Sequence, residues 1–380
     1  MGSARNRSAR ASLALVWMVS GLALVLSWTR EVHAQAVGAM TLHYRDDHRR
    51  NWDGTGPRPL ETAIWYPTSA TGPVAATQGS FFELPSVVPD APLADGRRTY
   101  PLIVISHGTG GCAPGMLWLG HYLAARGYIV VAANHHGNTC GEAKLDPRGF
   151  LLWWERPKDL TAILDHLLAD PVWGPRIDRQ RIGAAGFSLG GYTMIEIAGG
   201  RIDRARYAQF CASPARDFTC GAQPEFPDAP QLFQRLEPTD PVVQEALKHS
   251  GDSYRDPRIR AVFAIAPVFA EGFAAKDVAG IKIPVMIVVG ARDRVAPPAT
   301  NAKRYQELIH GARLVVIPGQ VDHYDFVPVC SEQGKQSTEP NIQRLCHDAP
   351  GVDRQRVQHD VAAMALDFFD QHLGAKRLRM

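Results

Sequence analysis

Short apolar runs recur along this chain and alternate with segments of helical patterning. The runs PLIVISHG (101–108), YIVVAANHH (128–136) and RIGAAGFS (181–188) are apolar almost throughout, with no alternation of polar and apolar residues. Such runs are typical of strands that are buried on both faces, which requires helices on both sides of the sheet. The pattern therefore predicts an α/β fold with a mostly parallel, doubly wound sheet.

Other segments extend this prediction toward both ends of the chain. Near the start, TLHYRDD and ETAIWYPT predict an antiparallel pair of strands. Apolar residues three and four positions apart predict helices over 160–168 and 357–368. Further parallel strands are predicted at 260–268, 284–293 and 313–319.

Residues 202–257 interrupt this alternation. The segment contains two cysteines, several prolines and many charges, and it is too long for a plain connection. We interpret it as an insertion after the helix that begins near residue 189. It would form either a cap over the strand ends or an excursion packed on one edge of the sheet.

The first 34 residues have the pattern of an export signal. Three arginines precede a long uncharged apolar run, and small residues lead to Ala34. This pattern predicts a signal peptide over 1–34, cleaved before Gln35, and a periplasmic or secreted domain over 35–380. The alternative is an uncleaved membrane anchor, because the run is long for a signal peptide. No cysteine follows the run directly, so a lipid anchor is not expected.

The charge balance excludes one class of partner. Four arginines and one glutamate in residues 1–34 account for the whole formal net charge of +3, so the remainder is neutral. A neutral chain without a basic stripe offers little to nucleic-acid phosphates. No later run reaches transmembrane length, so we expect no stable membrane insertion after signal removal. The sequence does not indicate an oligomeric state.

The six cysteines suit an exported protein with disulfides. None forms a C-x-x-C pair, which makes a zinc site a poor interpretation, and the even count favours disulfides. Proximity in sequence suggests Cys211–Cys220 and Cys330–Cys346. Cys112 and Cys140 then remain, on two loops that the predicted sheet brings together. The alternative is that some of these thiols are free and buried.

Gly186-Phe187-Ser188-Leu189-Gly190 follows a buried strand and opens a helix. A nucleophile elbow needs this arrangement, because only small residues fit on either side of a serine in so tight a turn. The strained turn lifts the hydroxyl clear of the sheet. It also directs the N–H of Leu189 and the positive end of the helix at the reacting oxygen. The stretch therefore predicts that Ser188 is a nucleophile.

A serine nucleophile needs a base that is held by an acid. The strand PVMIVVG runs into ARD, which places Asp293 at its carboxyl end, and RLVVIPG runs into QVDH, which places His323 just beyond its end. Both follow Ser188 in the chain order usual for such folds and emerge on the same edge of the sheet. Glu271 is the reserve acid and His347 the reserve base.

The loop after an early strand supplies the second oxyanion donor. SHGTGG follows PLIVI directly, its glycines permit close approach of the backbone, and the N–H of Thr109 is the predicted donor. We interpret His107 as a structural hydrogen-bonding residue under that loop rather than as a base. His135 and His136 offer metal-ligand atoms, but no carboxylate lies at a clear ligand spacing, so no metal is expected.

Six motifs, in this order, carry a resemblance to a known family: SHGTGG, NHHGN, RPKD, GFSLGGYT, GARDRVAPP and HYDF. Over roughly residues 40–375 the chain resembles the exported, predicted dienelactone-hydrolase group of the α/β-hydrolase superfamily, which is similar to platelet-activating-factor acetylhydrolases. The resemblance implies a triad of Ser188, Asp293 and His323, with Thr109 and Leu189 in the oxyanion hole. Cytosolic dienelactone hydrolases use a cysteine where this chain has Ser188, so the family name does not imply the substrate.

Together these features predict a secreted serine carboxylic-ester hydrolase that needs no cofactor and forms an acyl-enzyme. The expected substrate is a small-molecule or lipid-like ester. The same residues can also cleave amide, thioester, lipid or polyester bonds. An inert binding protein with a hydrolase fold is the alternative outside enzymes. Four aromatic residues are candidates either for an apolar acyl pocket or for core packing: Trp118, Trp153, Trp154 and Phe187.

Overall fold

The computed structural model describes residues 35–72 and 81–374. Residues 1–34 lie outside the described ranges, so the signal peptide and its alternative, an uncleaved anchor, stay predictions. Within the described ranges, no helix is long and apolar enough to cross a bilayer.

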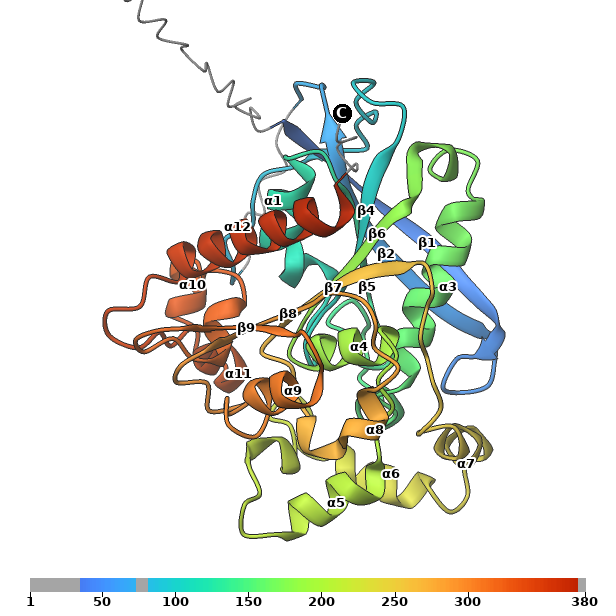
Figure 1. Cartoon of the computed structure of the whole chain (residues 1–380), viewed down its shortest axis with the longest axis vertical. Helices are drawn as coiled ribbons and strands as arrows, with labels where there is room; N and C mark the ends of the chain where they lie inside the picture. Colours follow the sequence, from blue (N-terminus) through green and yellow to red (C-terminus); the bar gives the residue numbers. More distant parts are fainter. Residues whose placement is uncertain (1–34, 73–80, 375–380) are drawn as a thin grey trace, which may run out of the picture. The chain divides into compact units, whose positions relative to one another are not determined.

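The described residues form a nine-stranded sheet with the order β3-β1-β2-β5-β4-β6-β7-β8-β9 (Figure 1). β2 pairs antiparallel with both β1 and β5, whereas all neighbours from β5 to β9 are parallel. The predicted antiparallel opening and parallel centre are therefore confirmed. The strands are β1 (Ala36–Arg50), β2 (Pro57–Thr68), β3 (Val88–Pro89), β4 (Tyr100–Ser106), β5 (Ile129–Ala133), β6 (Ile177–Phe187), β7 (Ile259–Ile265), β8 (Val285–Gly290) and β9 (Arg313–Ile317).

Helices cover the central strands in two groups. α1 packs against α12, which lies along β6 and β7, while α3 packs against α4, which also lies along β6 and β7. Because both groups cover the same strands, they lie on opposite faces, as a doubly wound sheet requires. The longer helices are α1 (Leu117–Ala124), α3 (Glu155–Ala169), α4 (Leu189–Ile197), α9 (Ala302–Leu308) and α12 (Arg354–Leu373). The shorter ones are α2 (Pro147–Leu151), α8 (Ala275–Val278), α10 (Glu332–Lys335) and α11 (Pro340–Leu345).

The strand order reverses at β4. The chain passes from β4 to β5 on one side and then returns to form β6 on the other, so Ser106 is paired with both Ala133 and Gly186. Open α/β sheets bind their ligands at such a reversal, beyond the carboxyl ends of the strands. The topology therefore points to the loops that follow β4 and β6.

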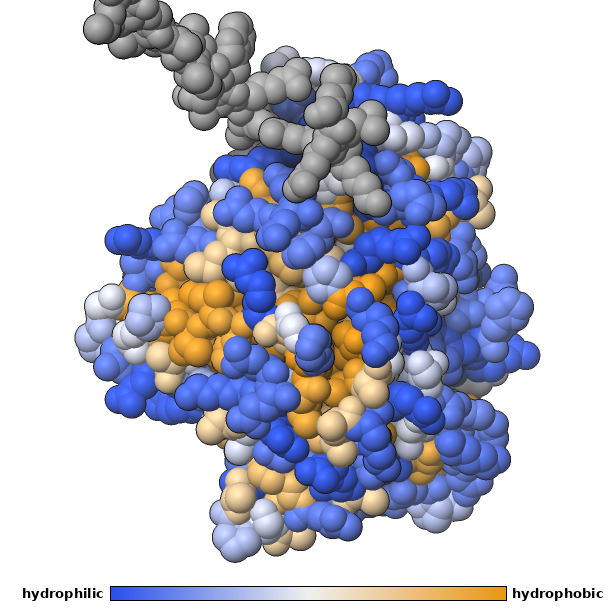
Figure 2. Space-filling model, in the orientation of Figure 1, coloured by the Kyte–Doolittle hydropathy of each residue, from blue (hydrophilic) through white to orange (hydrophobic). Residues whose placement is uncertain are grey.

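β9 forms one edge of the sheet, and it is less deeply buried than the central strands. Its Val316 is 36% exposed. On the face shown in Figure 2, hydrophobic residues gather near the centre and toward the side where β9 lies, and hydrophilic residues surround them.

The predicted insertion contains α5 (Arg204–Ala212), α6 (Ala229–Leu236) and α7 (Pro241–Lys248) between α4 and β7. Phe233 and Val243 of this segment join Trp52, Leu152 and Trp154 in a second hydrophobic cluster, separate from the main core. The indole N–H of Trp154 also donates to a backbone carbonyl of α7, that of Ala246, at 2.9 Å. The segment is thus packed on the region before α3, and its function as a cap stays a prediction.

The six cysteines, all within described residues, form three disulfides: Cys112–Cys140, Cys211–Cys220 and Cys330–Cys346. The expected pairing is confirmed, and the alternative of free buried thiols is wrong. Cys112–Cys140 joins the loops that follow β4 and β5, which are neighbouring parallel strands.

Candidate active site

Ser188 occupies a strained turn between β6 and α4. Its φ of 57° lies in the left-handed region, which a residue with a side chain rarely adopts. Its N–H donates to the carbonyl of Ile265 at 2.8 Å, which ties the turn to β7. A Cβ on Gly186 would lie 2.2 Å from the carbonyl oxygen of Gly190, and one on Gly190 would lie 2.0 Å from that of Ser106. The backbone therefore demands glycine on both sides of the serine.

Ser188, His323 and Asp293 form one hydrogen-bonded chain. Nε2 of His323 lies 2.9 Å from Oγ of Ser188, and Nδ1 lies 2.8 Å from Oδ2 of Asp293. A carboxylate only accepts, so Nδ1 carries the proton and Nε2 is free to accept from the serine hydroxyl. The structure thus brings together the three residues that the sequence placed at the ends of separate strands.

Backbone groups orient the acid and the imidazole. Oδ1 of Asp293 accepts from the N–H groups of Val295 at 3.0 Å and Ala296 at 2.7 Å, which leaves Oδ2 for the histidine. The N–H of His323 donates to Oδ1 of Asp322 at 2.7 Å, which caps a short helical turn. The ring of Phe187 lies 4.8 Å from the imidazole, centroid to centroid. These contacts fix the imidazole at one position and in one tautomer.

The loop after β4 lies directly against the serine. A Cβ on Gly108 would lie 3.3 Å from Cβ of Ser188, so only glycine fits without displacing the neighbours. No hydrogen bond between described residues occupies the backbone N–H of Thr109 or of Leu189. Both groups are therefore available to a ligand next to the serine, as an oxyanion hole requires.

The NHHGN turn holds the far end of this loop. Oδ1 of Asn138 accepts from the N–H of Gly110 at 2.6 Å, and Oδ1 of Asn134 accepts from that of Ala113 at 2.8 Å. Two asparagines of the motif thus give it a structural function that the sequence alone did not indicate. It anchors the loop after β4 to the loop after β5.

The inserted segment borders the same loop. A Cβ on Gly110 would lie 2.7 Å from Cβ of Glu225, and the Glu225 carboxylate pairs with Arg344 at 2.9 Å. A groove of about 820 Å³ extends from Tyr324, next to His323, between Phe218 of the insertion and the segment that contains Arg344. Two segments distant in sequence thus meet at the edge of the candidate site.

The reserve residues of the sequence analysis lie outside the chain of three. Glu271 lies 3.7 Å from Arg304, and His347 lines the groove. Three of the four candidate aromatics, Trp118, Trp154 and Phe187, are core residues, as the packing interpretation expected. The fourth, Trp153, is half-buried and stacks near Phe269, with ring centroids 4.1 Å apart.

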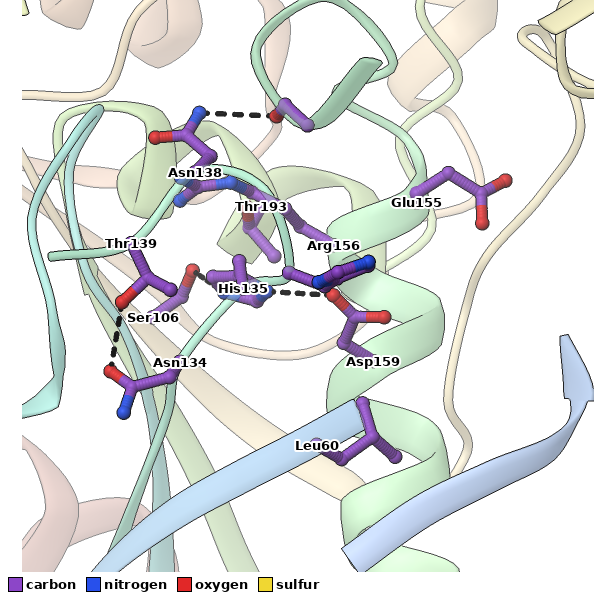
Figure 3. Close-up of polar contacts among 12 residues, drawn as sticks. Leu60, Ser106, Asn134, His135, Asn138, Thr139, Glu155, Arg156, Asp159 and Thr193 are labelled. Carbon is purple, nitrogen blue, oxygen red and sulfur yellow. Dashed lines mark hydrogen bonds and ion pairs between the residues drawn. The ribbon is translucent and has the colours of Figure 1, made fainter. Parts of the chain in front are cut away.

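The structure contains a second hydrogen-bonded chain of serine, histidine and aspartate, formed by Ser106, His135 and Asp159 (Figure 3). Nε2 of His135 lies 2.8 Å from Oγ of Ser106, and Nδ1 lies 2.9 Å from Oδ2 of Asp159. All three side chains are fully buried. Figure 3 shows His135 between Ser106 on β4 and Asp159 on α3. Because no substrate reaches a fully buried serine, this chain is structural.

Arginines neutralise the buried aspartate. Asp159 pairs with Arg58 and with Arg49, each at 2.7 Å. Burial alone would raise the pKa of Asp159, but the two guanidinium groups outweigh it and hold the pKa well below its ordinary value. Burial and the charge of Arg156 lower the pKa of His135 to about 4, so its imidazole is neutral at pH 7.

The sequence alone predicts no function for Arg156 or Asp159, the first and last residues of the RPKD motif. A signal was present: Arg156 precedes Leu160, Ile163 and Leu164 at helical spacing and so continues the apolar stripe of α3. A charge on an otherwise buried face must find partners inside the protein. The partners themselves come from other strands and are not visible in a local pattern.

The two histidines considered as metal ligands have other partners. Nδ1 of His136 lies 2.7 Å from Glu142, and its Nε2 accepts from the N–H of Trp52 at 3.1 Å. Both ring nitrogens of His135 are engaged by Ser106 and Asp159. Across residues 35–72 and 81–374, no group of three or more His, Cys, Asp or Glu side chains could hold a metal ion.

Comparison with known proteins places the chain in a family. Two cutinases of Thermobifida alba, est1 and est2, are each 33% identical to this chain over 109 residues, which is 28% of this chain and 33% of theirs. The match thus spans about a third of the length of these relatives. The structure of a ferulic acid esterase from Streptomyces cinnamoneus superposes with a TM-score of 0.55 at 21% identity and shares the fold. The superposition covers 91% of this chain and 93% of that one. The family model described as serine aminopeptidase, S33, matches residues 98–321, more than half of the chain, so the protein belongs to that family of α/β-hydrolases.

Proposed function

We propose that the protein is an exported serine hydrolase of carboxylic esters. The observation that carries the proposal is the hydrogen-bonded chain Ser188–His323–Asp293, which begins at a strained elbow and lies against the loop of Thr109, whose backbone N–H has no hydrogen-bond partner among the described residues. In this proposal Ser188 is the nucleophile, His323 the general base, and Asp293 the group that orients the imidazole and stabilises its charged form. Thr109 and Leu189 supply the oxyanion hole through their N–H groups.

The reaction proceeds in two steps. The Ser188 hydroxyl attacks the ester carbonyl while Nε2 of His323 takes its proton, and the oxyanion is bound by the N–H groups of Thr109 and Leu189. As the carbon–oxygen bond to the alcohol breaks, His323 returns the proton to the leaving oxygen. A water molecule, deprotonated by His323, then attacks the acyl-enzyme, and the carboxylic acid leaves as Ser188 regains its proton.

Ester substrates are favoured over amides for two reasons. First, the two relatives that match part of the sequence are cutinases, which favours esters, although the family that the chain belongs to is described as serine aminopeptidase. Second, an aminopeptidase must also bind the α-ammonium of its substrate, for which an unpaired carboxylate is the natural partner. Glu225, which lies against the Gly110 loop, is already neutralised by Arg344. We also propose that the protein belongs to the exported dienelactone-hydrolase group, which is similar to platelet-activating-factor acetylhydrolases. The name of this group does not identify the substrate.

Export is supported by the predicted signal peptide and by three disulfides, which persist in oxidising compartments. We expect the secreted protein to begin at Gln35. Intact mass and N-terminal sequencing of protein from the periplasm or medium test this directly. Retention of residues 1–34 in membranes would favour the uncleaved anchor instead.

A fluorophosphonate probe tests the nucleophile. We expect wild-type protein to be labelled once and Ser188→Ala not at all, because phosphonylation requires the activated hydroxyl. The matched control is Ser106→Ala, which removes the serine of the buried chain and should leave labelling intact. Absence of wild-type labelling, or equal labelling of Ser188→Ala, would contradict the proposal.

The same proteins can be compared on p-nitrophenyl esters of increasing acyl length and on aminoacyl p-nitroanilides. We expect turnover of the esters, loss of at least about 10⁴-fold in kcat for Ser188→Ala, and little turnover of the anilides. Preferential turnover of the anilides would favour the amidase alternative with the same three residues.

A further inference from the structure

The Gly108–Thr109 peptide links the proposed oxyanion hole to the protein interior. The carbonyl of Gly108 and the N–H of Thr109 belong to one planar peptide unit, and no described peptide bond is cis. In a trans peptide these two groups point in opposite directions. Whatever fixes the direction of the Gly108 carbonyl therefore also fixes the direction of the Thr109 N–H.

Three donors converge on the Gly108 carbonyl. Nδ1 of His107 lies at 2.7 Å, the N–H of Gly111 at 3.2 Å and Nη2 of Arg156 at 3.5 Å. Nη1 of Arg156 also donates to the preceding carbonyl, that of His107, at 2.5 Å. One guanidinium group thus contacts two successive carbonyls of the loop and fixes the turn on the side of the protein interior.

Arg156 is a fixed cation. It is 2% exposed and lies in the first turn of α3, the helix that also carries Asp159 (Figure 3). Burial lowers the pKa of its guanidinium to about 9, so it remains charged at neutral pH. A planar guanidinium keeps its donors in a rigid fork, which is suited to two adjacent carbonyl oxygens.

His107 is held in one protonation state. Burial and the neighbouring charge of Arg156 keep the pKa of its imidazole well below the ordinary value, so the ring is neutral. Its Nε2 accepts from the N–H of His135 at 3.3 Å, which leaves the proton on Nδ1. The neutral ring therefore donates to the Gly108 carbonyl and cannot change partners at pH 7.

We propose that Arg156 and His107 are positioning residues that aim the Thr109 N–H at the reacting oxygen by fixing the opposite side of the same peptide. This inference rests on the proposed function, because it concerns the oxyanion hole of that reaction. Neither side chain touches the substrate. Their effect reaches the transition state through a single backbone amide.

The principal test compares two buried arginines of the same charge network. Arg156→Lys removes the fork that holds the loop. Arg58→Lys is the matched control: Arg58 is equally buried and pairs with Asp159 at 2.7 Å, but it has no hydrogen bond to residues 107–111 among the described contacts. Each variant is measured for Tm, for kcat and KM on a p-nitrophenyl ester, and for affinity to a trifluoromethyl ketone. The Ser188 hydroxyl adds to the carbonyl of this ketone, and the carbonyl oxygen becomes an oxyanion.

We expect both variants to lose thermal stability and only Arg156→Lys to lose catalysis. A misdirected donor should cost less than a deleted one, so we expect kcat to fall about 10- to 100-fold with KM within about twofold of wild type. Affinity for the ketone should fall by a similar factor, because the ketone adduct carries the same oxyanion. Arg58→Lys should keep kcat within about twofold of wild type.

A second pair of variants covers the case in which Arg156→Lys does not fold. His107→Asn retains a donor near Nδ1, whereas His107→Ala removes it, so kcat should be higher in the asparagine variant. Equal kcat in that pair, or equal loss of kcat in Arg156→Lys and Arg58→Lys, would overturn the proposal. A wild type that turns over no ester contradicts the proposed function itself, whereas an active wild type with unchanged kcat in Arg156→Lys contradicts only this inference.

Discussion

The chain Ser188–His323–Asp293 and the chain Ser106–His135–Asp159 contain the same residue types at nearly the same distances. The serine–histidine separations are 2.9 and 2.8 Å, and the histidine–aspartate separations are 2.8 and 2.9 Å. Local hydrogen-bond geometry alone does not distinguish them. The difference lies in the backbone that carries each serine and in the charges around each aspartate.

Ser106 lies inside β4 and is paired on both sides by neighbouring strands, whereas Ser188 lies at a positive φ where a strand gives way to a helix. Asp159 is neutralised by two arginines, whereas Asp293 is held by backbone N–H groups that leave its charge for the imidazole. Under the proposed function, a hydrogen-bonded triad of these residue types is therefore not sufficient for chemistry. The serine must also project from the sheet toward donors for the oxyanion, and the acid must be able to stabilise a charged histidine.

The largest difference between the two chains is expected when the aspartate of each is replaced by asparagine, because one variant should lose turnover and the other stability. Asp293→Asn should lower kcat by about 10³- to 10⁴-fold with little change in stability, because the amide favours the wrong imidazole tautomer. Asp159→Asn should instead destabilise the fold by about 3–5 kcal/mol, because it leaves Arg58 buried without a counter-charge, although Arg49 keeps its ion pairs with Asp46 and Glu155. Ester turnover and urea unfolding of both variants check the prediction.

The comparison would fail if the two variants behaved alike. A fully stable Asp159→Asn would show that Arg58 finds another partner. We call Ser188–His323–Asp293 the outer chain and Ser106–His135–Asp159 the inner chain. A folded Asp293→Asn with wild-type kcat would show that the acid of the outer chain is not needed. Near-ultraviolet circular dichroism of each variant establishes which of them is folded before turnover is measured.

The second largest effect is expected from acidification, which should lower the stability contributed by His135 of the inner chain. His135 has a pKa of about 4 when folded and an ordinary value of 6.5, because it is buried and faces the charge of Arg156. Below pH 6.5 the unfolded chain binds a proton that the folded protein does not, so stability falls as the pH is lowered from about 6.5 to 4. The total effect of this one group is on the order of 3 kcal/mol.

Urea unfolding at pH 7 and pH 5 measures this effect. Arg58, His107 and Asp159 also face His135, and His107 acts in the same direction because its pKa is lowered too. Buried Glu196, whose pKa burial raises to about 8, acts in the opposite direction over this range. Relative to wild type, His135→Asn should therefore shift the change in unfolding free energy from pH 7 to pH 5 toward greater stability at pH 5. His359→Asn, on the exposed face of α12, should leave the difference unchanged. An unaltered difference in His135→Asn would contradict the assignment of the pH effect to the inner chain.

The outer chain was predictable from sequence because each member follows a strand that is visible as an apolar run. Ser188, Asp293 and His323 each follow such a run, and parallel strands bring their carboxyl ends to one edge. The pairing of Cys112 with Cys140 followed from the same topology. Export and the cap function of residues 202–257 remain predictions.

The inner chain was not predictable in the same way. Ser106 is an unremarkable residue within a buried strand, and its partners come from the next strand and from a helix more than 50 residues away in sequence. Arg156 acts on the backbone carbonyls of His107 and Gly108, and a sequence motif does not reveal such contacts. Sequence indicates only that a charge on the apolar stripe of α3 needs an internal partner.

The smallest contrast is in the stability of the two serine-to-alanine variants. Ser106→Ala leaves Nε2 of His135 without its partner in a site closed to water, which should cost about 1–3 kcal/mol of unfolding free energy. Ser188 is 6% exposed, whereas Ser106 is fully buried, so water can take the place of the hydroxyl in Ser188→Ala, and we expect a change within about 0.5 kcal/mol. Urea unfolding at pH 7 measures both. If Ser188→Ala proves the more destabilising of the two, the outer chain contributes to folding as much as to reaction. The separation of one chain for chemistry and one for structure would then be wrong.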